Sequence, residues 1–344
     1  MRRYNAANER LKRCYEQYLR EAKGQDDKSI DKVRAALVKF EESTKFKPFR
    51  AFRIDQARQF KDALSRAKTT KGKPLSLTTT DATLRLVKGF FHWLAGQQGF
   101  KKVLSYADVE YFNNNRKDAR AAHAQRPVHF PSKQAAYHAF QAMVDRTELE
   151  RRDKAMFAFV MITGARVAAV ASLRLKHINL VDGLVHQDGR EVQTKGGKTI
   201  TTWFFPMHPQ YLVCFTNWVT FLRNDKMFGQ EDALFPRPER RLVNGKFAFD
   251  TLSRRNYANG AKVNEVFRGA FEQVQMHPYG AHSARKTLGQ ELSDRNLPLA
   301  TQKAWSQNLG HERFTTTVSN YLPVSTQQQG ELIKGLDQGK IPHN

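Results

Sequence analysis

The feature that most constrains the fold is a change in character at residues 113–131. This stretch is polar and basic and is bounded by Pro127 and Pro131, whereas hydrophobic residues recur at regular spacing on both sides. Such composition is typical of a linker between domains. A chain of 344 residues is also longer than a single core usually supports. We therefore predict a helical domain over residues 1–115, a linker over 116–131 and a second domain over 132–344.

The first domain is predicted to be a compact bundle of four or five helices. The strongest pattern lies in residues 80–95, where Leu84, Val87, Phe91 and Leu94 recur at helical spacing. The other predicted helices span residues 2–23, 29–42 with Ser29 as the N-cap, 54–67 and 106–113.

The second domain is predicted to be mostly helical with a small sheet. Ser132 is expected to cap a helix over 133–144, and the apolar residues 153–163 predict a buried helix. Residues 184–206 alternate between polar and apolar and contain glycine turns, which indicates two or three short strands. Residues 236–246 are expected to form a basic loop. The predicted fold class is therefore mostly α with a small β-sheet, an α+β domain behind a helical bundle.

The charge balance points to a polyanionic partner. Lysines and arginines number 57 against 33 acidic residues, which gives a net charge of +24. Residues 1–126 hold 29 of these bases against 14 acids, and the rest of the chain holds 28 against 19. Because both parts are basic, we expect both to contact one long phosphate backbone.

Several other classes of protein are disfavoured. Cys14 and Cys214 are far apart and make no zinc-binding spacing. The N-terminus is charged throughout and is not a secretory signal, and the longest apolar run, residues 155–162, is far shorter than the ~20 residues of a membrane span. We expect a cytoplasmic, DNA-associated protein.

Two segments carry residues suited to holding a phosphate. In residues 162–180, Gly164 lets the chain turn and Arg166 opens a predicted helix; taken alone, Arg166 reads as a surface or ion-paired arginine. His282 and Arg285 are three residues apart and share one helix face. An imidazole and a guanidinium that converge can grip phosphate oxygens, although a capping histidine beside a solvated arginine explains this segment equally well.

Two further segments carry a nucleophile and a proton donor. His311 follows Gly310, and Tyr321 lies ten residues later. A tyrosine hydroxyl, with a pKa near ~10, needs positive charge nearby to become a nucleophile, and packing is the ordinary role of a tyrosine. Lys195 and Lys198 flank a Gly-Gly turn, where a lysine can enter a DNA groove and supply a proton or can simply be solvated.

The order of these residues resembles the tyrosine recombinase, or phage integrase, family across the whole second domain. The motifs are TGAR followed by LRLKHI, then HSARKT, and then LGHE with a tyrosine further on. The resemblance implies a site-specific DNA recombinase or integrase that works through a 3′-phosphotyrosine intermediate. It also implies a role for each residue: Tyr321 as nucleophile, Arg166 and Arg285 on the non-bridging oxygens, His282 and His311 completing the cradle, and Lys195 as general acid.

The resemblance also implies an architecture and partners. The first domain would be the family's SAM-like core-binding domain, and the two domains would form a C-shaped clamp on double-stranded DNA. A homotetramer on two recombination sites would exchange strands through a Holliday junction, with accessory DNA-bending proteins as possible partners. No metal or nucleotide cofactor is implied. Ser325 would cap a C-terminal helix over residues 326–336, which docks either on a neighbouring subunit or on its own domain.

The sequence departs from the family pattern at one position and is ambiguous at two. The family usually has an acidic residue three positions after the first arginine, and this chain has Ala169. Asp153 and Glu150 lie upstream as possible substitutes to orient Arg166. Lys198 competes with Lys195 for the role of acid, and Trp305 competes with His311 for the last cradle position, where Gly310-His311 fits better.

Two other functions remain open at this point. A type IB topoisomerase would use the same chemistry to relax supercoils without pairing two sites. A non-catalytic DNA-binding or architectural protein would form no covalent adduct, and Ala169 is the one feature in its favour.

Overall fold

The computed structural model describes residues 4–70, 72–124, 129–243, 246–295, 297–311 and 315. The chain divides into two compact units, residues 1–127 and residues 128–344. Each unit has its own hydrophobic core. In the part of the chain that is described, no helix is long and apolar enough to cross a bilayer.

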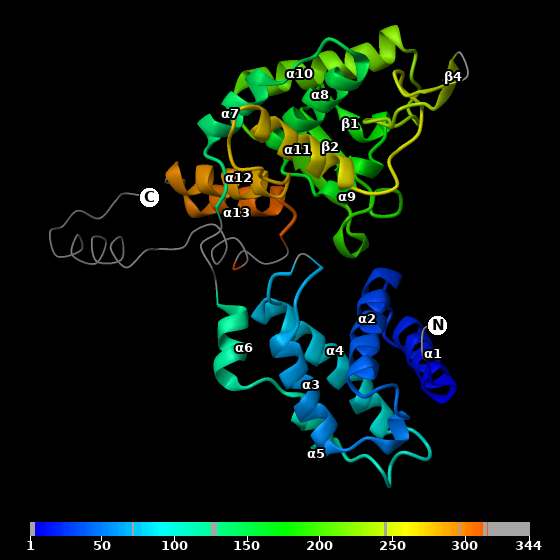
Figure 1. Cartoon of the computed structure of the whole chain (residues 1–344). Coiled ribbons are helices and arrows are strands. Elements are labelled where there is room, and N and C mark those ends of the chain that lie inside the picture. Colours follow the sequence, from blue (N-terminus) through cyan, green and yellow to red (C-terminus); the bar gives the residue numbers. More distant parts are fainter. Residues whose placement is uncertain are drawn as a thin grey trace, which may run out of the picture. The chain divides into compact units, whose positions relative to one another are not determined.

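Unit 1 is a bundle of helices around an aromatic core (Figure 1). Phe40 lies at its centre and contacts Phe60 and Phe91 edge-on, with ring centroids 5.3 and 5.0 Å apart. The bundle is helical as predicted. Its elements are α1 (Ala6–Glu21), α2 (Asp27–Ser43), α3 (Ile54–Arg66), α4 (Leu77–Ala95), α5 (Tyr106–Val109) and α6 (Arg116–His123), with the short 3-10 turns η1 (Phe49–Ala51) and η2 (Glu110–Phe112).

The start of α2 differs from the sequence-based expectation. Asp26, rather than Ser29, is the N-cap, and its carboxylate accepts a hydrogen bond from the Ser29 backbone N–H at 2.6 Å. Aspartate and serine are both good N-caps. Asp26 takes this role because it directly precedes the helix, whereas Ser29 already lies within it.

Helix α6 lies where the sequence predicted the linker, residues 116–131. Asn115 caps it by accepting from the Asp118 N–H, and Ala122 is buried. Thr78, at the start of α4, donates to the Ala122 carbonyl, and His123 lies 3.3 Å from the carboxylate of Asp81. Residues 116–123 of this basic stretch therefore form a capped helix that packs against α4 of unit 1.

Unit 2 is mostly helical with a small sheet, as the sequence predicted (Figure 1). Helix α8 (Glu148–Thr163) forms its centre, and residues 155–162 are buried on all faces. Ser132 caps α7 (Lys133–Ala142) by accepting from the Ala135 N–H, which confirms the predicted cap. The other helices are α9 (Val167–Ser172), α10 (Pro209–Thr220), which continues as the π-helical turn η5 (Phe221–Asp225), α11 (Ala261–Gln273), α12 (Ser283–Asp294) and α13 (Leu299–Asn308).

The sheet of unit 2 is antiparallel. It has three strands in the order β1 (Ile178–Asn179), β2 (Leu184–Gln187), β3 (Ile200–Trp203), and Val185 pairs with Thr202. The 3-10 turns η3 (Leu175–His177) and η4 (Lys195–Gly197) precede β1 and β3. A second pair of strands, β4 (Arg241–Val243) and β5 (Lys246–Ala248), begins within the predicted basic loop, residues 236–246, and extends beyond it. Leu242 faces Phe247 across this pair, and Arg240 stacks 3.6 Å from the Phe247 ring centroid, so the segment is paired where a loop was expected.

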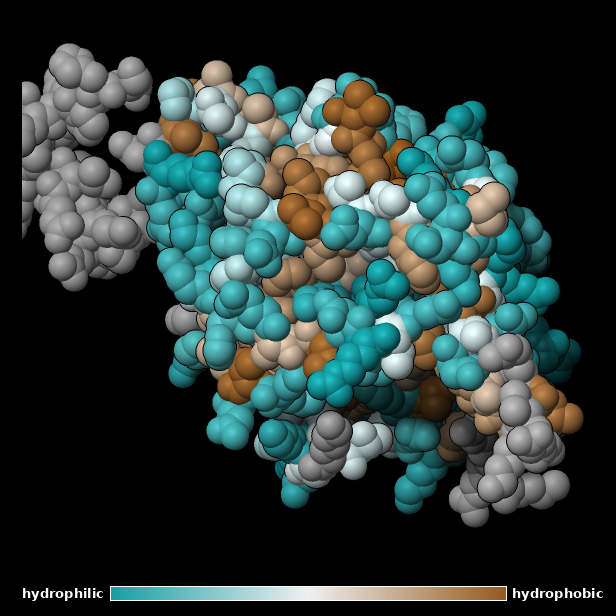
Figure 2. Space-filling view, turned by 90° about the horizontal axis from the view of Figure 1, so that it is seen from above, coloured by the Kyte–Doolittle hydropathy of each residue, from teal (hydrophilic) through white to brown (hydrophobic). Residues whose placement is uncertain are grey.

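Seen from above, the surface is mainly hydrophilic, and the hydrophobic side chains on this face form small separate patches (Figure 2). Small separate patches are ordinary for a globular surface and do not by themselves indicate a binding site.

Candidate active site

Arg285 is the centre of the candidate site. It lies in the first turn of α12, and only 3 % of its surface is exposed. Its guanidinium donates to the Gly164 carbonyl at 2.8 Å and to the Leu309 carbonyl at 2.7 Å, and it contacts Nε2 of His311 at 2.9 Å. One buried cation thus joins the end of α8, the start of α12 and the segment after α13.

Two glycines make this close packing possible. Gly164 ends α8 with φ +60°, and a Cβ there would lie 2.8 Å from Leu309 Cδ2 and 2.9 Å from Leu288 Cδ1. Gly310 has φ +69°, and a Cβ there would lie 2.8 Å from Cδ1 of Ile200 on β3. Both the left-handed backbone and the lack of space favour glycine. The glycines of the TGAR and LGHE motifs therefore have a packing role beside the candidate site.

The surroundings lower the pKa of both histidines, which favours the neutral imidazole. Burial, together with the nearby cations Arg285 and Arg166, lowers the pKa of His311 to about 4. Burial also lowers the pKa of His282, helped by Arg285, Lys286 and Arg166. Because His311 Nε2 accepts from Arg285, the proton is assigned to Nδ1, which leaves that nitrogen as a donor. A neutral imidazole carries one N–H, which is the kind of group that can donate to a phosphate oxygen.

Arg166 is the N-cap residue of α9 and is half-buried. Its positive charge acts on both His282 and His311, so it belongs to the same electrostatic cluster. Among the residues that the structure describes, no hydrogen bond or ion pair engages its guanidinium. Ala169 is buried in α9 and offers no polar group to Arg166.

Neither upstream acid orients Arg166. Oδ1 of Asp153 accepts two hydrogen bonds from the buried Arg152, from Nε at 2.9 Å and from Nη2 at 2.7 Å. Asp153 also forms an ion pair with Lys262 at 3.2 Å. Glu150 instead forms the capping box of α8 with Thr147.

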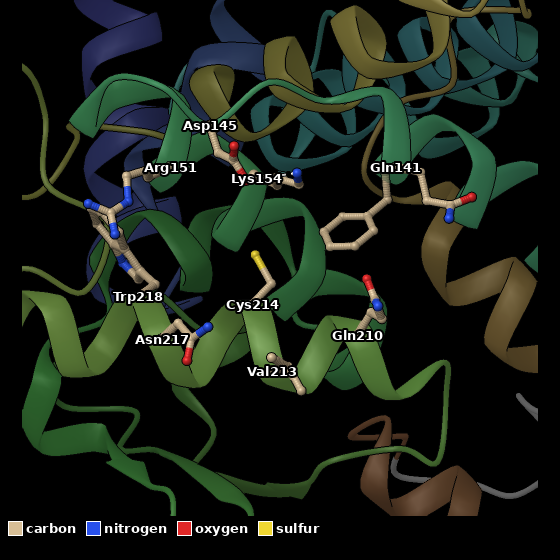
Figure 3. A pocket seen from close by; sticks show the side chains of 10 residues that line it. Gln141, Asp145, Arg151, Lys154, Gln210, Val213, Cys214, Asn217 and Trp218 are labelled. Carbon is tan, nitrogen blue, oxygen red and sulfur yellow. Dashed lines mark hydrogen bonds and ion pairs between the residues drawn. The ribbon is translucent and has the colours of Figure 1, made fainter.

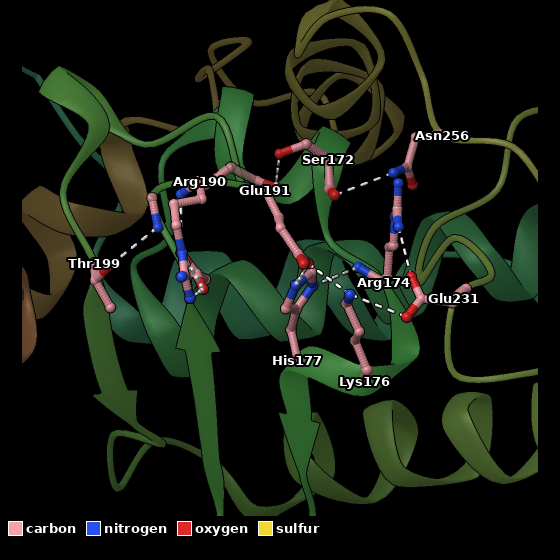
Figure 4. Close-up of polar contacts among 12 residues, drawn as sticks. Ser172, Arg174, Lys176, His177, Arg190, Glu191, Thr199, Glu231 and Asn256 are labelled. Atoms are coloured by element: carbon pink, nitrogen blue, oxygen red, sulfur yellow. Dashed lines mark hydrogen bonds and ion pairs between the residues drawn. The ribbon is translucent and has the colours of Figure 1, made fainter.

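The segment that joins β2 to β3, called the lysine hairpin below, carries Lys195 and Lys198. Its base is held by ion pairs, and its tip is exposed. Lys195 lies in η4 between β2 and β3 and is exposed, whereas Lys198 is half-buried. Behind the tip, Glu191 pairs with Lys176 at 2.7 Å and with His177 at 3.2 Å (Figure 4). No contact that the structure describes joins Lys195 to Arg285 or His311, so the choice between Lys195 and Lys198 stays open.

The structure thus brings together Arg166, His282, Arg285 and His311, and it leaves Lys195 on an exposed hairpin. Tyr321 and the predicted helix over residues 326–336 lie outside the described residues. Trp305 lies in a small core cluster, with its ring centroid 4.7 Å from that of Phe205, and His311 is the residue in contact with Arg285.

Lys286 is a site neighbour that sequence reasoning missed. It is half-buried, desolvation lowers its pKa, and its charge acts on His282. Its position directly after Arg285 in the HSARKT motif was the one available signal.

Away from this site, a hollow of about 400 Å³ lies between α7, α8 and α10 and contains none of the predicted site residues (Figure 3). Burial raises the pKa of its cysteine, Cys214, to about 11, so the thiol stays protonated at neutral pH. The ion pair between Lys154 and Asp145, at 2.9 Å, satisfies the charges at one edge. The other basic residue of its lining, Arg151, lies 4.4 Å from the centroid of the Phe221 ring.

Comparison with known proteins gives two kinds of match. A family model described as the phage integrase family matches residues 133–328. Among solved structures, the Tn1549 transposon integrase in complex with transposon right end DNA is similar with a TM-score of 0.61 and 14 % identity, covering 95 % of this chain and 99 % of that one. A lambda integrase dimer bound to a COC′ core site has a TM-score of 0.60 and 14 % identity, covering 91 % and 94 %.

The XerH site-specific recombinase bound to its difH substrate is similar with a TM-score of 0.58 and 14 % identity, covering 94 % of this chain and 84 % of that one. At such low sequence identity, these matches show that the chain shares their fold and nothing further. No curated protein sequence matches the chain.

Proposed function

We propose, on the premise that this chain belongs to the phage integrase family, that it is a tyrosine site-specific recombinase with Tyr321 as its nucleophile. The observation that carries the proposal is the cluster around Arg285. Arg285 contacts His311 directly, and Arg166 and Arg285 both act on His282 and His311. Two cations and two neutral imidazoles in one place suit a phosphodiester.

In the proposed reaction, the Tyr321 oxygen attacks the scissile phosphorus and the bond from phosphorus to the 5′-oxygen breaks. Arg166 and Arg285 hold the non-bridging oxygens, where negative charge grows in the transition state. His282 and His311 donate to the same oxygens. Lys195 gives its proton to the departing 5′-oxygen, and the nearby cations favour the phenolate of Tyr321. The 3′-phosphotyrosine keeps the energy of the cut bond, so resealing needs neither ATP nor a metal ion.

A basic hollow supports binding to the DNA backbone beyond the scissile phosphate. It has a volume of about 910 Å³ and is formed by the segment around β4 and β5 and by the start of α11. Its basic lining residues are Arg237, Arg240, Arg254, Arg255 and Lys262. The DNA-bound integrases of similar fold are consistent with this use of the surface. A DNA-associated, cytoplasmic location follows from the proposed substrate.

For strand exchange we propose a homotetramer on two recombination sites that resolves a Holliday junction, with residues 326–336 as the docking segment between subunits. Accessory DNA-bending proteins are compatible partners.

The test is a nicked suicide substrate carrying a candidate recombination site. Wild-type protein should give a covalent protein–DNA adduct, and Tyr321→Phe should bind the same DNA and give none. An adduct that survives in Tyr321→Phe would move the nucleophile elsewhere, and no adduct with wild type would favour a purely architectural role. Efficient relaxation of supercoiled DNA that lacks a site would favour a type IB topoisomerase.

A further inference from the structure

We propose that residues 256–264, which lie outside every motif, act as a brace that sets the spacing of Arg166, His282 and the lysine hairpin. The brace rests on the proposed function, since its purpose is to align a phosphate cradle. It consists of three contacts: Gly260 and Asn256 contact the two ends of α9, and Asn264 contacts the loop before His282.

The first contact fixes the start of α9. Gly260 is the buried N-cap residue of α11, and a Cβ built on it would lie 2.7 Å from the carbonyl carbon, the Cβ and the oxygen of Val167. Two of these three atoms are backbone, so they have no rotamer with which to move away. Val167 directly follows Arg166. The backbone next to Arg166 therefore packs directly against Gly260, where any larger residue would clash.

The second contact fixes the loop before His282. Asn264 lies one turn after Gly260, so the two share a face of α11. Its Oδ1 accepts from the Ala281 N–H at 3.1 Å. A Cβ on Gly280 would lie 3.1 Å from the same oxygen, which shows how closely the loop packs there. One helix face thus contacts both the segment of Arg166 and the segment of His282.

The third contact fixes the far end of α9. The Asn256 side-chain N–H donates to the Ser172 carbonyl at 3.1 Å (Figure 4). The Ser172 hydroxyl in turn accepts from the Gln193 N–H at 2.9 Å, two residues before Lys195. The six-residue helix α9 is therefore held at both ends, and its end is linked to the base of the hairpin.

The brace answers a need created by Ala169. Without an acid at that position, the described residues give the Arg166 guanidinium no hydrogen bond or ion pair, so its placement depends on its backbone. The brace can supply a firm backbone because α11 is itself anchored in the core: Val263 and Phe267 are fully buried. Gly260, Asn256 and Asn264 are thus positioning residues, which act through Arg166, His282 and the hairpin.

The central variant is Gly260→Ala. Gly269→Ala is its matched control, because Gly269 lies in the same helix and a Cβ there would meet nothing within 4 Å. A misplacement of about 1 Å in a catalytic group costs roughly a hundredfold in rate. Single-turnover cleavage of the suicide substrate should fall tenfold to a hundredfold in Gly260→Ala, with DNA affinity changed less than about threefold. Gly269→Ala should cleave at the wild-type rate.

A double-mutant cycle separates positioning from general damage. If Gly260 acts through Arg166, then Gly260→Ala should cost much less when Arg166→Ala is already present. The same fold loss in both backgrounds, or equal losses in Gly260→Ala and Gly269→Ala, would overturn the proposal.

A second pair of variants keeps the test open if Gly260→Ala does not fold. Asn264→Leu removes the acceptor for the Ala281 N–H, whereas Asn264→Asp keeps it. Cleavage should fall in Asn264→Leu and be largely restored in Asn264→Asp, and equal rates in the two would overturn the second contact. Wild-type cleavage is measured alongside: its absence would reject the proposed function, whereas its presence with unaffected variants would reject the brace alone.

Discussion

The low pKa of His311 predicts a specific dependence of stability on pH. Its folded pKa of about 4 lies below the ordinary value of about 6.5, because the half-buried imidazole is partly desolvated and lies near Arg285 and Arg166. As the pH falls from 6.5 towards 4, the unfolded chain takes up a proton that the folded protein refuses. The contribution of His311 to the free energy of unfolding is therefore fully present above pH 6.5. It is lost as the pH drops, by at most about 3 kcal/mol.

The comparison that isolates this contribution uses His311→Gln. Glutamine does not titrate, and its amide oxygen can still accept from Arg285. Urea unfolding of both proteins is followed at pH 7 and pH 4.5 by tryptophan fluorescence, since unit 2 contains Trp203, Trp218 and Trp305. The free energy of unfolding should fall by about 2–3 kcal/mol more in wild type than in His311→Gln. Equal falls in the two proteins would refute the burial of a neutral His311 beside two arginines.

Three further predictions follow from the same geometry. Arg285→Ala should lower single-turnover cleavage by about 10²–10³-fold, because a fixed donor to the transition state is lost; near-normal cleavage on the suicide substrate would contradict its role. Gly310→Ala should destabilise the fold by about 1–3 kcal/mol in urea unfolding, because its Cβ would press on Ile200 at a positive φ; an unchanged midpoint would argue against this packing. Arg237→Ala and Arg255→Ala should each reduce the slope of log affinity against log salt by about 1; unchanged slopes would place the backbone contacts elsewhere.

The sequence placed Arg166, His282, Arg285 and His311 in one predicted site, partly from local spacing and partly from the family resemblance. His282 and Arg285 share a helix turn, and Gly310 and His311 follow one another, so these relations are local. The proximity of Arg285 and His311 is long-range, and it was expected from the family resemblance rather than from spacing, whereas the contact of Arg285 with the Leu309 carbonyl was not predicted.

The errors came from local patterns that tertiary contacts override. Residues 116–123 are basic and polar, which predicted a linker, but capping by Asn115 and burial of Ala122 against unit 1 make them a helix. Residues 236–246 are equally basic, yet Arg241–Val243 pair with Lys246–Ala248 as antiparallel strands. Composition alone does not distinguish a solvated segment from one with a single buried face.

The brace was out of reach for a different reason. Gly260 and Asn264 carry no motif, and their partners Val167 and Ala281 lie 93 and 17 residues away in sequence. A glycine whose role is to leave space for another backbone looks like any other glycine until the fold is known. The absence of an acid at Ala169 was visible in the sequence, but what compensates for it was not.

The central claim is that Tyr321 attacks a DNA phosphate that is held by the cluster around Arg285. The most direct measurement is to digest the covalent adduct formed by wild-type protein on a suicide substrate and to map the modified residue by mass spectrometry. The account predicts a single nucleotide-bearing peptide with the modification on Tyr321. Modification of another residue, or an adduct that persists when both Arg166 and Arg285 are replaced by alanine, would contradict it.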